Sequence, residues 1–404
     1  MSTKETLQNV TKELMKIEGV EEYELHIEGD SEKGGNFLGD VTFFSIVPNN
    51  GQKEYNLVMK TAKTSNELRK SLPLGKAYER EAFMYQQMIP EFRKFIKSIG
   101  AAVEIDYVPK VLWCEVEEKM ETLILENLNN VGYRVLDSTK PLNLDHVLVV
   151  LRTLGKHHAL SIAMKDKSPE KFEGMTKDLS KIWIHYLANT FTNTFFKPAI
   201  ERASKVLEER GRKDLASKLD EKLKENIVSL LLRETPAEDK IVVCHGDCWN
   251  NNILFKYKGS EQTTPSGLYF VDYQLSMLET PIDDLSFFLY TSCDKSVLDQ
   301  FDLLLQTYYN SLASTVKMFG CELEKYLTLE KLMDQWKEYG ATGLIIATLL
   351  LRIELLKPDE APDLTEIVEN GNDTSEAFCM KIDNEDLYDN RILDIFSHFA
   401  ERFL

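Results

Sequence analysis

Three oxygen-bearing side chains in residues 241–274 have the types and spacing that suit transfer of a phosphoryl group. Asp247 and Asn252 lie in a polar turn between two apolar runs, and Asp272 ends the next apolar run. A carboxylate in a rigid turn can accept the proton of a reacting hydroxyl. Amide and carboxylate oxygens are suitable ligands for Mg²⁺. The pattern indicates a general base, Asp247, between two metal ligands, although Asp and Asn also occur in ordinary turns.

Two charged residues nearer the N-terminus complete a set that is typical of ATP sites. Lys60 closes an apolar run, and Glu81 lies on a segment with helical period. In kinases, a strand Lys pairs with a helix Glu and so faces the α- and β-phosphates of ATP, while the spacing D-x-x-x-x-N recurs in their catalytic loops. Two alternatives stay open here: Lys60 is an ordinary exposed strand-end lysine, or Glu79 replaces Glu81 in the pair.

The N-terminal elements that must position Lys60 and Glu81 are mainly strands. A glycine-rich turn, Gly34–Gly39, precedes two apolar, β-rich runs, and Asn50-Gly51 between those runs is a strong hairpin signal. The pattern therefore predicts a meander of antiparallel strands. The predicted elements are a helix at 5–18, strands at 41–47 and 55–62, a helical stretch at 66–98, and strands at 103–116 and 121–125.

The remainder of the chain has mainly helical periodicity, interrupted by one β-rich patch around Asp247. The boundary is expected near Glu126–Leu128. This predicts an α+β fold with a small β-rich lobe, residues 1–126, and a larger helical lobe, residues 127–404. The predicted elements are a helix at 145–164, two helices within 180–232, strands at 240–243, 253–257 and 267–271, and mostly helices from 284 to 404.

Composition excludes several classes of protein. The 404 residues contain 66 acidic and 48 basic side chains, a formal charge of −18, which argues against a general nucleic-acid binder. With 43% hydrophobic residues, the chain can bury a large core and is not a disordered protein. The six cysteines form no close C-x-x-C pair, so no zinc site is expected. Without an apolar span or a secretory signal, we expect no membrane association and a reducing, cytoplasmic location.

Two windows carry a resemblance to a known family. His245-Gly246-Asp247 through Asn252, followed by Val271-Asp272-Tyr273-Gln274, resembles the aminoglycoside/choline kinase group of protein-kinase-like folds, and more closely the ecdysteroid kinase-like (CHK kinase-like) family. The resemblance implies a bilobal protein-kinase-like fold. Supporting segments are Glu81–Tyr85 with Pro90–Phe92, Glu126–Leu128 with Gly132-Tyr133, and His158–Ser161.

The resemblance implies an ATP- and Mg²⁺-dependent enzyme that phosphorylates a hydroxyl of a small molecule, such as an ecdysteroid or a foreign compound. Asp247 would be the base, Asn252 and Asp272 would bind metal, and Lys60 with Glu81 would position phosphate. Further residues implied are Gly35 and Asn36 of the glycine-rich turn and the connector residues Glu126 and Leu128 for the nucleotide, with His245 and Asp284 supporting the catalytic loop.

The sequence departs from the family pattern mainly at the glycine-rich turn, where Gly39 replaces a usual Ser and Phe43 a frequent Arg. The altered turn keeps open a catalytically silent nucleotide-binding protein of the same fold, and a protein kinase is a further rival class. No Ala-Pro-Glu element follows Asp272, which argues against a protein kinase. The sequence does not settle the acceptor, the reacting hydroxyl or the oligomeric state.

The expected acceptor is a lipophilic alcohol. Five aromatic residues in the predicted helical insertion motivate this expectation, although they could equally belong to the core. They are Trp183, Tyr186, Phe191, Phe195 and Phe196.

Three further residues lie in or near the windows that carry the resemblance. His158 is predicted to be a satisfied core histidine, since it lies among apolar residues at helical spacing. Asp283 is expected to be a surface neighbour of Asp284. Trp249 either stacks on the substrate or seals the loop.

Overall fold

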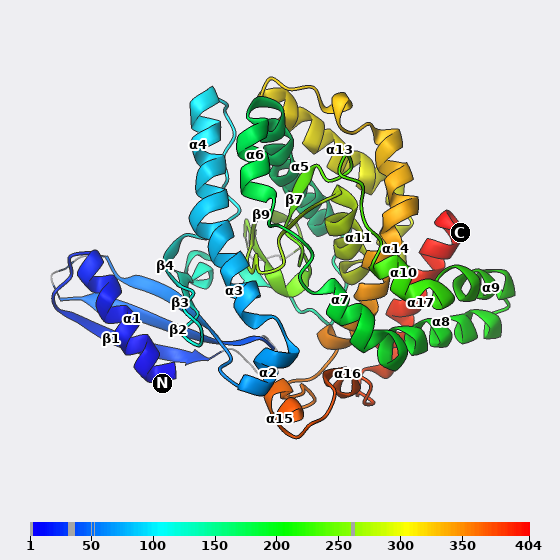
Figure 1. Cartoon of the computed structure of the whole chain (residues 1–404), viewed down its shortest axis with the longest axis horizontal. Coiled ribbons are helices and arrows are strands. Elements are labelled where there is room, and N and C mark those ends of the chain that lie inside the picture. Colours follow the sequence, from blue (N-terminus) through cyan, green and yellow to red (C-terminus); the bar gives the residue numbers. More distant parts are fainter. Residues whose placement is uncertain (1–2, 31–36, 50, 52, 260–262) are drawn as a thin grey trace.

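The computed structural model describes residues 3–30, 37–49, 51, 53–259 and 263–404. Figure 1 shows an elongated sheet with its own helix at one end of the molecule and a larger, mainly helical body at the other. The expected α+β fold of the bilobal, protein-kinase-like type is therefore confirmed.

The N-terminal sheet has five antiparallel strands in the order β1-β2-β3-β5-β4. The predicted hairpin is present, because β2 and β3 pair along almost their whole length. Side chains alternate between the two faces of β3, so Leu57 and Met59 lie on one face while Val58 and Lys60 lie on the other. The strands are β1 (Tyr23–Asp30), β2 (Gly39–Pro48), β3 (Tyr55–Ala62), β4 (Val111–Glu115) and β5 (Thr122–Glu126).

Helix α1 (Thr3–Ile17) covers one face of this sheet (Figure 1). Its apolar stripe, which includes Leu7 and Leu14, packs with Phe44, Met59 and Ile124 in a small core that is separate from the main one. With this face closed by α1, the opposite face of β3 is left to line a cleft, and Lys60 lies on that face.

The helical stretch between β3 and β4 is interrupted once, at Leu72-Pro73. It comprises α2 (Asn66–Ser71), α3 (Leu74–Phe83), a π-helical turn η1 (Met84–Met88) and α4 (Ile89–Ile99). Helices α3 and α4 join through η1 without a gap, and this wider π turn lies just before Pro90, which has no N–H to donate to the helix.

The C-terminal part is built on α5, α11, α13 and α14, whose apolar side chains belong to one large core. Helix α5 packs on α13, and α11 packs on α14. The helices are α5 (Leu144–Lys167), α6 (Pro169–Thr176), α7 (Ile184–Tyr186), α8 (Lys197–Glu209), α9 (Lys213–Lys222), α10 (Ile227–Leu231), α11 (Pro281–Ser292), α12 (Lys295–Leu298), α13 (Phe301–Met318), α14 (Leu329–Glu354), α15 (Leu364–Glu369), α16 (Thr374–Ala377) and α17 (Glu385–Phe403).

The segments between these helices form short strands and short 3₁₀- or π-helical stretches. Two small antiparallel sheets, β10-β7 and β6-β8-β9, hold the predicted β-rich patch. Their strands are β6 (Arg134–Val135), β7 (Val242–Cys244), β8 (Ile253–Tyr257), β9 (Pro265–Phe270) and β10 (Met277–Glu279); the turns are η2 (Leu128–Val131), η3 (Leu187–Phe196), η4 (Lys224–Asn226), η5 (Asn250–Asn252) and η6 (Leu323–Lys325).

One local prediction was wrong. Residues 103–110 are irregular rather than strand, and β4 begins only at Val111, after Pro109. Within 180–232 the chain forms two helical runs, as predicted. The first consists of α7, η3 and α8, which follow one another without a gap, and the second of α9, η4 and α10, which begins after Gly211. None of the helices in the described ranges is long and apolar enough to cross a membrane.

Candidate active site

The polar turn between β7 and β8 is held in one conformation by close backbone packing. Gly246 has a φ of 84°, and a Cβ at this position would lie 2.1 Å from the carbonyl oxygen of Leu275. Only glycine fits both conditions. Asp247 follows directly, and η5 then turns the chain so that Asn252 lies at the start of β8.

Asp284 lies at the start of helix α11 and anchors the polar turn between β7 and β8. Its two carboxylate oxygens accept hydrogen bonds from the backbone N–H groups of His245, at 2.7 Å, and Gly246, at 2.8 Å. His158 of α5 also contacts Asp284, at 3.0 Å. Burial alone would raise the pKa of Asp284, but the hydrogen bond from His158 and its charge outweigh burial and hold the pKa below its usual value.

His245 links the turn to the end of β9 as a neutral ring. The backbone N–H of Asp247 donates to Nδ1 of His245 at 3.2 Å, so Nδ1 is unprotonated and Nε2 carries the proton. Nε2 then donates to the carbonyl oxygen of Val271 at 3.0 Å. Burial lowers the pKa of His245, which keeps the ring neutral. His245 thus connects the Asp247 turn to the residue before Asp272.

Asp247 and Asn252 are adjacent in space as well as in sequence. Nδ2 of Asn252 donates to the carboxylate of Asp247 and to its backbone carbonyl, both at 2.9 Å. Burial raises the pKa of Asp247 to about 8, and the negative charge of Asp272 acts in the same direction. Because Asn252 uses its amide nitrogen for Asp247, its amide oxygen is the atom left for a metal ion.

Lys60, Glu81 and Asp272 form a buried charged cluster. Nζ of Lys60 lies 2.8 Å from Glu81 and 2.7 Å from Asp272, and the Lys60 side chain is only 6% exposed. Burial would lower the pKa of Lys60, but the two carboxylates raise it well above its usual value. Burial raises the pKa of Glu81, and the positive charge of Lys60 acts in the opposite direction. Glu81 rather than Glu79 therefore pairs with Lys60, and Lys60 is not an exposed strand-end lysine.

Asp272 has an unusual backbone conformation. Its φ of 67° is left-handed, a region that Asp tolerates better than most residues but that is uncommon outside glycine. A backbone conformation of this kind persists only where surrounding contacts hold it, and residues that adopt it often lie at functional sites. Here the Val271 carbonyl is bonded to His245 and the Asp272 carboxylate to Lys60.

Arg80, next to Glu81 on α3, is a positioning residue that the sequence pattern did not reveal. Its guanidinium donates to the backbone carbonyls of Asp178, Ser180 and Ser276, all in the C-terminal part. Arg80 therefore ties α3, and with it Glu81, to the segment that follows Asp272. The only sign of this contact in the sequence is that an arginine stands next to Glu81, the glutamate that pairs with Lys60.

A first cavity, of about 240 Å³, lies on the open face of the N-terminal sheet. Lys60, Glu81, Asn252 and Asp272 line its charged end. Val41, Val58 and Leu125 form an apolar wall, and Glu126 and Leu128 close it from the connector. All the nucleotide and metal residues expected from the sequence therefore line this cavity, which we call the nucleotide cavity, except Gly35 and Asn36, which lie outside the described residues.

A second cavity, of about 190 Å³, adjoins the first and also contains Asn252 and Asp272 in its wall, together with Asp247. The rest of its lining is predominantly apolar. Trp183, Tyr186 and Phe191 contribute to it as the sequence suggested, whereas Phe195 and Phe196 are buried and lie outside its lining. Trp249 lines this cavity too. We call it the acceptor cavity.

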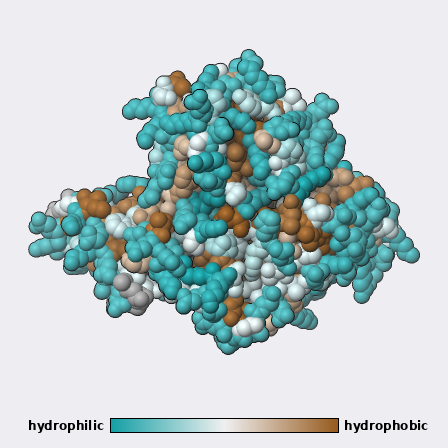
Figure 2. Space-filling view, in the orientation of Figure 1, coloured by the Kyte–Doolittle hydropathy of each residue, from teal (hydrophilic) through white to brown (hydrophobic). Residues whose placement is uncertain are grey.

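Residues near the C-terminus close the acceptor cavity, which the sequence did not suggest. Leu364 of α15 and Phe378, just after α16, are part of its wall, and Phe378 packs edge-on against Phe37 with ring centroids 5.7 Å apart. Helix α15 also contacts α2, where Ser65 donates to Glu369 at 2.7 Å (Figure 1). The surface around these elements is largely hydrophilic, with apolar residues concentrated over the middle of the face near α3 and α7 (Figure 2).

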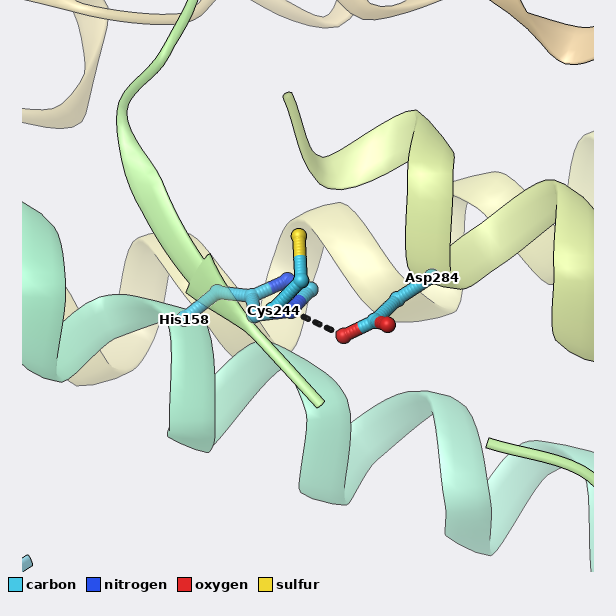
Figure 3. A group of neighbouring side chains, drawn as sticks. All are labelled: His158, Cys244 and Asp284. Atoms are coloured by element: carbon cyan, nitrogen blue, oxygen red, sulfur yellow. Dashed lines mark hydrogen bonds and ion pairs between the residues drawn. The ribbon is translucent and has the colours of Figure 1, made fainter. Parts of the chain in front are cut away.

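A fully buried group of His158, Cys244 and Asp284 lies next to the Asp247 turn (Figure 3). Its polar atoms are already bonded: His158 contacts Asp284 at 3.0 Å and Tyr308 at 2.8 Å, and Cys244 donates to the carbonyl of Thr280. Burial raises the pKa of the Cys244 thiol, which keeps it neutral. We interpret this group as a hydrogen-bonded support, with His158 the satisfied core histidine that its sequence context suggested.

A strand lysine paired with a helix glutamate, facing an Asp–Asn turn and a second Asp across a cleft, defines the class of protein-kinase-like phosphotransferases. The sequence model of the ecdysteroid kinase-like family matches residues 33–321, more than half of the chain. The chain therefore belongs to the ecdysteroid kinase-like family. No curated protein matches the chain.

Proposed function

We propose that the protein uses ATP and Mg²⁺ to phosphorylate a hydroxyl of a small, largely apolar alcohol. The observation that carries the proposal is the meeting of two cavities at Asn252 and Asp272, with Asp247 on the side of the apolar one. A triphosphate entering from the nucleotide cavity and an alcohol entering from the acceptor cavity would meet beside the same carboxylate.

Each residue has a separate proposed role. Lys60, oriented by Glu81, contacts the non-transferred phosphates, and Asp247 receives the proton of the acceptor hydroxyl. The backbone of Glu126–Leu128 receives the adenine. The oxygens of Asn252 and Asp272 suit Mg²⁺, which supplies neutralisation of the charge on the phosphates. We further propose that residues 1–126 form the nucleotide-binding lobe and residues 127–404 the catalytic and acceptor-binding lobe.

The nature of the acceptor follows from the lining of its cavity. Trp183, Tyr186 and Phe191 offer apolar faces, which favour a lipophilic alcohol over a polycation such as an aminoglycoside. Ecdysteroids, sterol glycosides and phenols are the compounds to test with ATP. Mass spectrometry of the reaction mixtures would detect a product that has gained one phosphate, whereas phosphorylation of choline or aminoglycosides alone would contradict the assignment.

The catalytic assignment is tested with Asp247→Ala. We expect turnover to fall by about 10²–10⁴-fold, the usual contribution of a general base, while ATP binding persists. The matched control is Asp359→Ala, at an exposed position far along the chain, which should keep wild-type turnover. Full turnover in Asp247→Ala would refute the role of Asp247. A wild-type protein that gains thermal stability with Mg²⁺ and ATP yet transfers no phosphate would instead be the silent nucleotide-binding protein.

A further inference from the structure

A third cavity, of about 80 Å³, adjoins the acceptor cavity, and we call it the inner cavity. The two share five lining residues, namely Trp183, Leu187, Leu275, Phe287 and Ile346. Gly246, the neighbour of Asp247, lines this inner cavity. The inner cavity is therefore separated from the proposed reaction site by only a few side chains.

One face of α14 runs along both cavities. Thr342, Gly343 and Ile346 line the inner cavity, and Ile346, Leu349 and Ile353 line the acceptor cavity. From Gly343 to Ile353 this face is about 15 Å long at 1.5 Å per residue. The two spaces thus form one elongated, apolar groove with α14 as its floor.

The inner end of this groove carries a buried charged pair. Lys181 and Asp283 both line the inner cavity, and their charged atoms lie 2.7 Å apart. The Asp283 side chain is only 7% exposed, so the expectation that it is a surface neighbour of Asp284 was wrong. The reason is that α11 begins here with its first turn packed inside the C-terminal part.

Two polar atoms of residues that line the inner cavity have no hydrogen-bond partner among the described residues. They are Oδ2 of Asp283, whose other oxygen is paired with Lys181, and the indole Nε1 of Trp183. A buried acceptor and a buried donor without partners are costly, and a ligand group that satisfies them gains affinity accordingly. One atom needs a donor and the other needs an acceptor, and a hydroxyl group supplies both.

The charges around this end favour a neutral group. Lys181 disfavours an ammonium group at the same place, while Asp283 and Glu279, which lies 4.0 Å from Lys181, disfavour a carboxylate. Lys240 neutralises Glu279 from the other side at 3.1 Å. A neutral hydroxyl therefore fits better than either ion.

We propose that Asp283 and Trp183 bind a second hydroxyl of the acceptor, remote from the hydroxyl that is phosphorylated, so that the preferred acceptor is an elongated apolar diol. This inference rests on the proposed function, because it takes the acceptor cavity as the place of the reacting alcohol. Asp283 and Trp183 are specificity residues here and do not contact the reacting atoms.

The test compares straight-chain diols, from hexanediol to dodecanediol with hydroxyls at both ends, with the mono-alcohols of equal length. We expect the wild-type protein to prefer at least one diol, with a lower KM than its mono-alcohol. In Asp283→Asn the KM for that diol should rise about tenfold relative to the KM for the mono-alcohol, the loss typical of one hydrogen bond to a charged group. Trp183→Phe, which removes the N–H and keeps the ring, should reduce the same preference.

The control is Asp239→Asn, which neutralises a carboxylate that pairs with Lys331 at 2.7 Å outside all three cavities and should keep the wild-type ratio of KM values. The inference is overturned if every diol behaves like its mono-alcohol, or if Asp283→Asn lowers kcat equally for both acceptors, as displacement of Asp284 would. Calorimetric binding of the alcohols separates the two proposals. Diol-selective binding without phosphate transfer supports this inference and counts against the proposed function, whereas transfer without diol preference does the reverse.

Discussion

The nucleotide cavity and the acceptor cavity meet at Asn252 and Asp272, but different parts of the chain build them. The nucleotide cavity is lined by residues between Val41 and Asp272, all inside the segment that matches the family. The acceptor cavity also takes residues up to Phe378, well beyond that segment. The first holds a charged cluster, and the second is mostly aromatic and aliphatic.

This difference indicates which cavity can change in sequence without altering the charged cluster on which the proposed phosphoryl transfer depends. The charged cluster needs fixed distances between Lys60, Glu81 and Asp272, and short strands with one anchored helix provide them. The apolar wall needs only volume and shape, and helices that lie outside the family segment supply part of it. Under the proposed function, changes in α14 to α16 would therefore alter the choice of acceptor and leave phosphoryl transfer unchanged.

The largest effect is expected for Lys60→Met, which changes the nucleotide cavity alone. Removing the buried cation leaves Glu81 and Asp272 without their shared partner, and it removes one donor from the phosphates. We expect kcat to fall by about 10²–10³-fold, as for loss of one preorganised donor, and ATP binding to weaken. The affinity for the acceptor alcohol, measured by calorimetry without ATP, should stay at the wild-type value.

Lys63→Met is the matched control, since Lys63 lies just beyond β3 and pairs at the surface with Asp40. It should retain wild-type kcat, because exposed ion pairs contribute little. If Lys60→Met weakened acceptor and ATP binding equally, the two cavities would not be the independent sites that their linings suggest.

The nucleotide side of the site could be predicted from the sequence because its residues sit at strand ends and turns with local signals. Asn50-Gly51 predicted the hairpin that carries Lys60 on β3, and the D-x-x-x-x-N spacing predicted the adjacency of Asp247 and Asn252. The choice of Glu81 over Glu79 needed the structure, because both lie on α3 and only packing decides which one faces Lys60.

The acceptor side could be predicted only in outline. Trp183 and Phe191 were suggested by their type, yet Phe195 has the same type and spacing and lies outside the cavity lining. The contribution of Phe378 depends on contacts between residues far apart in sequence, which no local pattern encodes. Asp283 was misjudged for the same reason, because its burial depends on how α11 packs.

Asp284 bears on both cavities, because it holds the turn that carries Asp247 and Asn252. Asp284→Asn keeps the size of the side chain but loses the charge that accepts bonds from His245, Gly246 and His158. We expect a loss of about 2 kcal/mol in the free energy of unfolding, within the range for hydrogen bonds to a buried charge. Urea denaturation at neutral pH measures it.

The pH dependence of this loss has a defined sign. The pKa of Asp284 is lower in the folded protein than its ordinary value of 3.8, so the carboxylate contributes stability above that pH. The contribution disappears as the pH falls through the folded pKa, and the wild type should then approach Asp284→Asn. A difference between the two proteins that grew on acidification would contradict the assigned role.

The smallest expected effect tests the C-terminal wall of the acceptor cavity. Phe378→Leu keeps an apolar side chain but removes the edge-on ring contact with Phe37 and part of the cavity wall. We expect the KM for the acceptor to rise about fivefold, which corresponds to about 1 kcal/mol for an aromatic pair, with the KM for ATP unchanged. Phe319→Leu is the matched control, since Phe319 packs on Phe95 outside both cavities. A larger change in the KM for ATP than for the acceptor would show that α15 and α16 act on the nucleotide side, because they bridge to α2, rather than on the choice of alcohol.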